Sequence, residues 1–398
     1  MTRRLWLAII CGGITLSLAV GLRQSFGLFL GPISVDLGFG REVFAFGMAM
    51  QNLIWGLATP FAGAIADRFG SGRVAAAGGV LYAAGLMVMS ASGDGTDIMV
   101  ASLLVGLGLG GVGFSVILGA VARAAPPERR SWALGVVSAF GSLGQFMVVP
   151  FAQAMLSALG WSGALLLLAA LSLTMVGLAA GVAAPASDST GVSRQTLKAA
   201  LAEASRHRGF WLLTAGFFVC GFHVVFVATH LPAYLADQAL PTWLGAASLS
   251  LVGFFNVIGT YVCGLLGGRY PKKTVLSLLY LTRSLVFLVF IMVPLSEISV
   301  LVFAAALGLL WLGTVPLTSG LVAHFFGPAH MSMLYGIVFV SHQVGSFFGA
   351  WLGGYAFDLT GSYDSMWWLS VALGLVSALL HWPIVERPVA RLAGAPAQ

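Results

Sequence analysis

Two arginines lie inside apolar segments of the sequence that are long enough to cross a membrane. Arg23 precedes Pro32 by nine residues, and Arg283 follows Lys273 by ten. At a rise of about 1.5 Å per residue, each lies about 14–15 Å from the end of its segment, near mid-depth in a bilayer. A guanidinium stays charged and is costly there, so each arginine must face a polar cavity or a partner. Its planar fork matches the two oxygens of a carboxylate, whereas carbonyls, amides and water are the alternative partners.

The positions of the acidic residues limit what these arginines can meet. All 13 Asp and Glu residues lie in loops or at the ends of apolar segments. A carrier of cations, or a proton relay built on carboxylates, would need an acid within the membrane. The sequence therefore argues against both, and it leaves Arg23 and Arg283 as candidate ligands for an anionic substrate.

Two histidines are candidates for binding the substrate and for proton coupling, because histidine changes charge near neutral pH. His223 corresponds to Arg23 when the sequence is shifted by 200 residues, and His342 lies in a later apolar segment. The alternative is that each histidine is a hydrogen-bonded packing residue. Neutral side chains in these segments are candidates either for binding a substrate or for joining helices. They are Gln51, Asn52, Asn256, Thr260, Trp311, Thr314, Tyr335 and Gln343.

Other chemistry finds little support in the sequence. The three cysteines lie in apolar segments without metal-ligand spacing, so neither a metal site nor a disulfide framework is expected. The sequence contains no zinc-binding helix motif and no nucleophile elbow, and no strand is evident before a glycine-rich loop. We therefore expect no catalytic residues and no cofactor, and the chain is not predicted to be an enzyme.

The elements that position these residues follow from the composition. Of the 398 residues, 59% are hydrophobic and 8% are charged, against about 25% charged in a soluble domain. The apolar runs are continuous, and about 20 residues of helix cross a bilayer, so we predict an all-α membrane protein. Twelve spans are predicted, at residues 6–32, 43–66, 74–92, 97–122, 131–158, 161–184, 209–235, 243–268, 274–294, 298–323, 331–357 and 364–384.

The basic residues follow the predicted loops and do not indicate a nucleic-acid partner. If the N-terminus is cytoplasmic, the predicted external loops hold only Arg41 among the 19 Lys and Arg residues. This positive-inside pattern predicts cytoplasmic N- and C-termini for a multi-pass protein of a bacterial-type inner membrane. The basic residues on the cytoplasmic side are Arg3, Arg4, Arg68, Arg73, Arg123, Arg129, Arg130, Arg194, Lys198, Arg206, Arg208, Arg269, Lys272, Lys273, Arg387 and Arg391.

The chain divides into two similar halves around its one long polar stretch. We predict a six-helix bundle at 1–184, a cytoplasmic linker with an interfacial helix at 185–208, and a second bundle with a short tail at 209–398. An offset of 200 to 201 residues aligns the halves and places Pro32 on Pro232 and Gly119 on Gly320. Parallel duplication of this kind is typical of transporters, in which two bundles move about a site held between them.

The loop after the second predicted span carries a recognisable motif. It reads GAIADRFGSGR over residues 63–73 and resembles the signature loop of the major facilitator superfamily. The resemblance covers the whole chain and implies two six-helix bundles with a gating loop. A copy at 264–273 keeps the glycine and the basic residues but lacks the aspartate. The residues that match the motif are Gly63, Asp67, Arg68, Gly70 and Arg73.

Two further segments resemble one group within that superfamily. The fifth span begins RRSWALG at 129–135, and the first span contains FGLF at 26–29. Both are similar to the monocarboxylate transporter and oxalate/formate antiporter group. Members of that group usually have an aspartate and, four residues later, an arginine in the eighth span, where this chain has Asn256 and Thr260. A substrate arginine would therefore have to come from another helix.

These observations together predict a secondary carrier that works by alternating access. The expected cargo is a small organic anion, for which the resemblance implies a monocarboxylate, moved by proton symport or by exchange for a counter-anion. We expect a monomer in the lipid bilayer. A carrier or exporter of a larger amphipathic or aromatic compound is the alternative, and a non-transporting membrane sensor is a third hypothesis.

Overall fold

The computed structural model describes residues 3–125, 130–183, 197–326 and 331–390, and every regular element in these ranges is an α-helix. A helix satisfies its backbone groups within one apolar segment, as lipid requires. The helices are α1 (Arg3–Gln24), α2 (Gly27–Leu37), α3 (Arg41–Phe69), α4 (Ser71–Ser90), α5 (Gly95–Val112), α6 (Phe114–Ala124), α7 (Arg130–Leu178), α8 (Leu197–Ser205), α9 (Arg208–Asp237), α10 (Thr242–Arg269), α11 (Lys272–Met292), α12 (Glu297–Leu310), α13 (Thr314–Phe326), α14 (Met331–Thr360) and α15 (Asp364–His381).

Ten segments of the described chain are long and apolar enough to cross a membrane. Helix α7 supplies one of them, although it contains two helices that meet at Gly160, where φ is 70°. Helix α3 is not among the ten, and its middle carries the amides Gln51 and Asn52. The chain is therefore a multi-pass membrane protein, whereas the count of twelve spans and the cytoplasmic position of the termini stay predictions.

Three of the predicted spans are broken in two, which the sequence did not lead us to expect. The first span breaks between α1 and α2, the fourth between α5 and α6, and the tenth between α12 and α13. Gly113 and Gly313 lie at the last two breaks and correspond at the offset of 200 residues. A break frees backbone N–H and C=O groups that must find partners within the protein.

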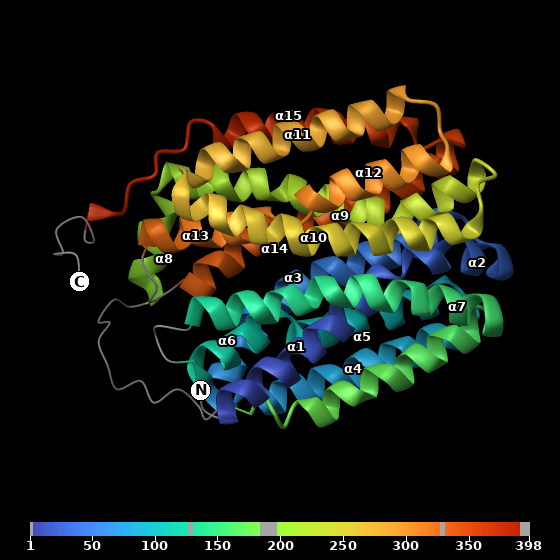
Figure 1. The fold of residues 1–398 in the computed structure, drawn as a ribbon. Coiled ribbons are helices and arrows are strands. Elements are labelled where there is room, and N and C mark those ends of the chain that lie inside the picture. The colour runs from blue at the N-terminus through green and yellow to red at the C-terminus, as the bar shows by residue number, and fades with distance from the viewer. Residues whose placement is uncertain (1–2, 126–129, 184–196, 327–330, 391–398) are drawn as a thin grey trace.

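Helices α1–α7 gather in the lower part of Figure 1 and helices α9–α15 in the upper part. The described chain begins at residue 3 and stops at residue 390 at the same end of the bundle, here named the near end. The connections at 38–40, 238–241 and 361–363 lie at the opposite, far end. Of the predicted linker at 185–208, residues 185–196 lie outside the described residues, and Leu197–Ser205 forms α8.

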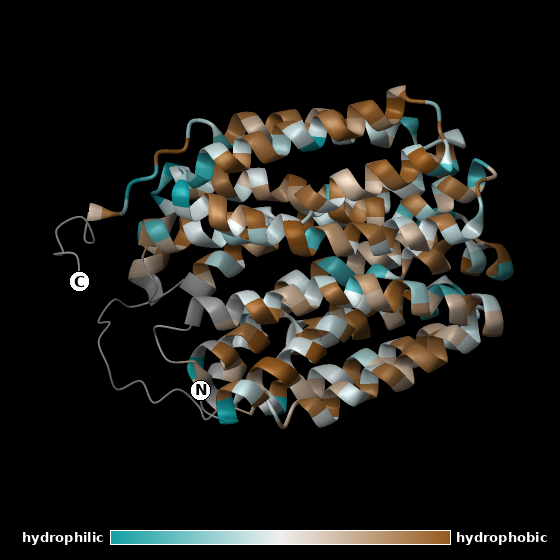
Figure 2. Ribbon diagram, viewed as in Figure 1, coloured by the Kyte–Doolittle hydropathy of each residue, from teal (hydrophilic) through white to brown (hydrophobic). Residues whose placement is uncertain are grey.

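The surface of the bundle suits a membrane. Figure 2 shows hydrophilic colouring mainly toward the two ends of the bundle and hydrophobic colouring along the helices. Large apolar side chains point outward, and Leu285, Val302 and Leu379 are each more than half exposed. Exposed apolar surface of this extent is expected to face lipid rather than water.

Among the described helices, the two groups meet mainly along three pairs of elements. Helix α3 packs along α14, α7 along α10, and α2 against α9. Gly27 lies at the last contact, where a Cβ atom would come 2.0 Å from the carbonyl oxygen of Ala228. Glycine is therefore needed for α2 to approach α9 this closely, and the first span touches the opposite half just beyond its break.

Candidate functional site

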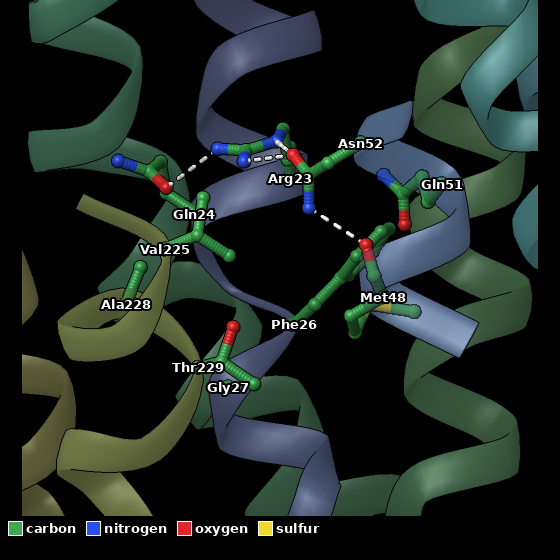
Figure 3. A pocket seen from close by; sticks show the side chains of 10 residues that line it. All are labelled: Arg23, Gln24, Phe26, Gly27, Met48, Gln51, Asn52, Val225, Ala228 and Thr229. Atoms are coloured by element: carbon green, nitrogen blue, oxygen red, sulfur yellow. Dashed lines mark hydrogen bonds between the residues drawn. The ribbon is translucent and has the colours of Figure 1, made fainter. Parts of the chain in front are cut away.

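Arg23 lies at the end of α1, next to the break in the first span. The last carbonyls of a helix carry partial negative charge, so a cation is favoured at this place. The arginine lines a cavity together with Asn52 of α3 and Thr229 of α9. Figure 3 shows this cavity between elements of both groups of helices. The break that positions Arg23 was not predicted from the sequence.

Neutral amides occupy the hydrogen-bonding positions around Arg23. Its Nε donates to Oδ1 of Asn52 at 3.1 Å, its Nη2 donates to the same oxygen, and its Nη1 donates to Oε1 of Gln24 at 3.1 Å (Figure 3). The guanidinium carbon lies 5.2 Å from the ring centre of Trp55. Among the residues that the structure describes, no carboxylate pairs with Arg23. The edge that fits a carboxylate therefore holds a single amide oxygen.

Gln51 adds unused hydrogen-bonding capacity to the same cavity. Its side chain is 1% exposed, and neither its amide nitrogen nor its amide oxygen has a partner among the described residues. A buried amide without partners costs free energy, so this one is expected to bind water or a ligand. The cavity is small, with room for about one water molecule.

Two chains of amides connect this cavity to the opposite group of helices. In the first, Nε2 of Gln24 donates to Oε1 of Gln145 at 3.2 Å, and Nε2 of Gln145 donates to the carbonyl of Leu249 in α10 at 2.9 Å. In the second, Nε2 of Gln343 in α14 donates to the carbonyl of Asn52 at 3.0 Å. Residues that hold Arg23 therefore also take part in contacts between the halves.

Arg283 lies elsewhere, fully buried on α11 and not among the residues that line the cavity. Its Nη2 donates to the carbonyls of Leu310 and Trp311, the latter at 2.7 Å, where α12 ends. Its Nε and Nη1 have no partner among the described residues. Arg283 thus satisfies carbonyls that the broken tenth span frees, which is the alternative partner set considered for it from the sequence.

Asn256 satisfies the other side of the same break. Its Oδ1 accepts from the backbone N–H of Leu312 at 3.0 Å and from Oγ1 of Thr260 at 3.0 Å. Its Nδ2 donates to Oγ of Ser142 in α7 at 2.9 Å, which joins the two halves. Asn256 and Thr260 stand where the monocarboxylate transporter group has its aspartate and arginine. Their hydrogen bonds lie at the break in the tenth span and not beside Arg23.

The remaining candidates do not line the cavity. Trp311 and Thr314 flank the break, and the hydroxyl of Thr314 lies 3.1 Å from the sulfur of Cys220. Tyr335 packs its ring against Phe217 and Phe339. Of the twelve substrate-binding candidates from the sequence, the structure brings Arg23, Gln51 and Asn52 into one cavity, with Gln343 bonded to its edge.

The two candidate proton-coupling histidines have different surroundings. His223 is fully buried, and its Nε2 lies 2.8 Å from the carbonyl of Ser370 in α15, within its own half. It does not line the cavity, although it corresponds to Arg23 in the repeat. His342 lies 2.8 Å from Oε1 of Gln343 and stacks on Phe339. His342 is therefore the histidine connected to the cavity, through Gln343.

The signature loop is described only in part. Gly70 ends α3 with a φ of 96°, a value that favours glycine, and its N–H donates to the carbonyl of Ala66 at 2.9 Å. Gly63 lies near Ser115, and Arg73 is exposed. The side chains of Asp67 and Arg68 lie outside the described residues, so the predicted gating role of the loop is untested.

A charged cluster at the far end of the bundle was not singled out from the sequence. Arg41 forms an ion pair with Asp237 at 2.5 Å. The carboxylate of Asp358 accepts from the backbone N–H groups of Arg41 and Glu42 at 3.1 and 2.8 Å, and Nε1 of Trp351 donates to Glu42 at 2.9 Å. We name these five residues the far-end cluster. The sequence did contain a signal for this cluster, because oppositely charged residues occur at three loops that are all predicted on the same side of the membrane.

Comparison with known proteins identifies relatives along nearly the whole chain. A family model described as Major Facilitator Superfamily matches residues 5–331. The uncharacterized MFS-type transporter YcxA of Bacillus subtilis is 26% identical, over 88% of this chain and 88% of its own. Monocarboxylate transporter 13 of Rattus norvegicus is 26% identical, over 90% of this chain and 84% of its own. A probable sulfoacetate transporter, SauU of Cupriavidus necator, is 26% identical over 95% and 93%.

Proposed function

The chain belongs to the major facilitator superfamily, and on that premise we propose that it is a secondary carrier of a small organic anion. The cargo is a monocarboxylate or a short sulfonate, since relatives are named for both classes. The carrier works as a monomer in an inner membrane, with both termini in the cytoplasm. It couples transport to proton symport or to exchange for another anion.

One observation carries the proposal for the cargo. Arg23 lies in a cavity between the two halves, and an amide rather than an acid holds the edge of its guanidinium. A charged group inside a membrane protein needs a counter-charge or several hydrogen bonds. An anionic cargo would supply the missing charge at a place that both halves can reach.

The contacts between the halves support alternating access. The far-end cluster ties the halves where the Arg41–Asp237 ion pair forms, and the cavity beside Arg23 has room for about one water. A cargo larger than water therefore requires the halves to separate before it can bind. In this proposal the far end is external and closed in the conformation described.

The other candidates have supporting roles. Arg283 and Asn256 hold the broken tenth span, because their hydrogen bonds go to backbone groups at the break. His342 is the favoured proton-coupling residue, since it is bonded to Gln343 and through it to the cavity. His223, which bonds within its own half, is the weaker candidate.

The proposal is tested by uptake of radiolabelled anions into proteoliposomes. Arg23→Gln should abolish saturable uptake of pyruvate, lactate or sulfoacetate, because the guanidinium is the only charge among the described residues that line the cavity. Arg4→Gln serves as the matched control, since Arg4 is exposed on the same helix. Wild-type activity in Arg23→Gln would refute the role of Arg23. Transport of bulky aromatic compounds, without transport of short anions, would favour the alternative of a larger amphipathic or aromatic cargo.

A further inference from the structure

We propose that Asn52 is the resting ligand of Arg23 and that the anionic cargo displaces its amide oxygen. This inference rests on the proposed function and goes beyond it by naming what occupies the anion site when no cargo is bound.

The geometry at Arg23 places one oxygen where a bound anion would place two. Nε and Nη2 both donate to Oδ1 of Asn52, and this pair of nitrogens forms the edge that a carboxylate binds bidentately. Sharing one neutral acceptor between two donors is weaker than giving each a charged oxygen. A carboxylate or sulfonate can therefore replace the amide with a gain in hydrogen-bond strength.

Asn52 is itself held in position for this role. Its Nδ2 donates to the carbonyl of Met48 at 2.6 Å, one turn earlier on α3, and its side chain is 3% exposed (Figure 3). This bond fixes the amide so that its oxygen points toward Arg23. An oxygen held in this way gives the buried guanidinium an acceptor before cargo binds, which limits the cost of an unpaired charge in the membrane.

Displacing Asn52 also changes how the first span is held. The bonds from Arg23 to Asn52 join the end of α1 to α3. Helix α3 is in turn fastened to the opposite half by Gln343 at the cavity and by Asp358 and Trp351 at the far end. Exchange of the amide for the cargo therefore releases α1 from a helix that is bound to the other half, which links cargo binding to movement of the halves.

Two substitutions at Asn52 separate a resting ligand from a direct ligand of the cargo. Asn52→Leu keeps a similar volume and removes the competing oxygen, so the dissociation constant for an anion should fall about tenfold, as expected for loss of a hydrogen bond to a charged group. Asn52→Asp supplies a permanent carboxylate to the same edge of Arg23, so anion binding should weaken at least about 100-fold. Both substitutions are at the same position, and the inference predicts opposite changes in anion affinity for the two variants.

The measurement is isothermal titration of the purified full-length protein with pyruvate and with sulfoacetate. Thermal unfolding of each variant shows that it is folded, and Thr59→Val is the matched control on α3, since the Thr59 hydroxyl bonds only to the carbonyl of its own helix at Trp55 among the described residues. If Asn52→Leu is unfolded, Asn52→Ala replaces it with the same expected sign.

The outcomes are distinguishable. Tighter binding by Asn52→Leu together with weaker binding by Asn52→Asp supports the inference. Weaker binding by both variants makes Asn52 a direct ligand of the anion and overturns the inference. Unchanged binding by Asn52→Asp also overturns the inference. Absence of binding to both anions in the wild-type protein contradicts the proposed function itself, and the inference falls with it.

Discussion

Arg23 and Arg283 are both arginines within predicted spans, yet their surroundings indicate different roles. Arg23 contacts side-chain amides, which can rotate away when a ligand arrives, and it faces a cavity. Arg283 contacts backbone carbonyls at the end of α12, which cannot leave without unwinding the chain. Partners that can move suit a binding residue, whereas fixed partners suit a structural one.

Replacing Arg283 should therefore affect stability more than binding. Arg283→Gln removes charge-assisted bonds to two carbonyls, which are worth about 1.5–3 kcal/mol each when a charged donor is involved. We expect the free energy of unfolding in detergent to fall by about 3 kcal/mol, with anion affinity changed less than about threefold. Arg283→Lys should recover part of the stability, because it keeps one charged donor. A loss of anion affinity at unchanged stability would instead indicate that Arg283 binds the anion.

The elements explain which parts of this arrangement the sequence could predict. Continuous apolar runs depend on local composition, so the all-helical class and the approximate positions of most apolar segments were predictable. The breaks at Gly113 and Gly313 were not, because a single glycine within an apolar run has the same pattern whether the helix continues or stops. The partners of Arg23 also depend on packing between distant helices, which no local pattern records.

Two glycines on α14 offer a test at the scale of elements. A Cβ atom at Gly345 would lie 1.9 Å from the carbonyl of Phe218 in α9, whereas one at Gly336 on the same helix would meet nothing within 4 Å. Gly345→Ala should force α9 and α14 apart and cost about 1–3 kcal/mol of unfolding free energy. Gly336→Ala should be neutral or raise stability by up to about 1 kcal/mol. Thermal unfolding of the two variants side by side measures the difference, and equal effects would contradict the close packing.

At the scale of the whole molecule, the contacts between the halves differ in kind along the bundle. The cavity region is joined by neutral amides, such as Gln145 to Leu249 and Gln343 to Asn52. The far end is joined by charges, with Arg41 paired to Asp237 and over the ring of Phe357 at 3.9 Å. Charges at the far end are exposed enough to be hydrated when the halves part, which keeps the cost of opening low.

The Arg41–Asp237 pair should therefore set how often the far end opens. Arg41→Gln and Asp237→Asn each remove the pair, which is worth about 1 kcal/mol at an exposed site, so opening should increase roughly fivefold. The double variant should behave like either single variant, because the same interaction is lost only once.

The readout is the rate at which an impermeant maleimide labels Thr229→Cys from the far side, with the three native cysteines replaced by alanine. Arg4→Gln, at the near end, should leave the rate unchanged. If the effects of the two single variants add in the double variant, the two residues act separately. Asp358 and Trp351 would then hold the far end closed instead.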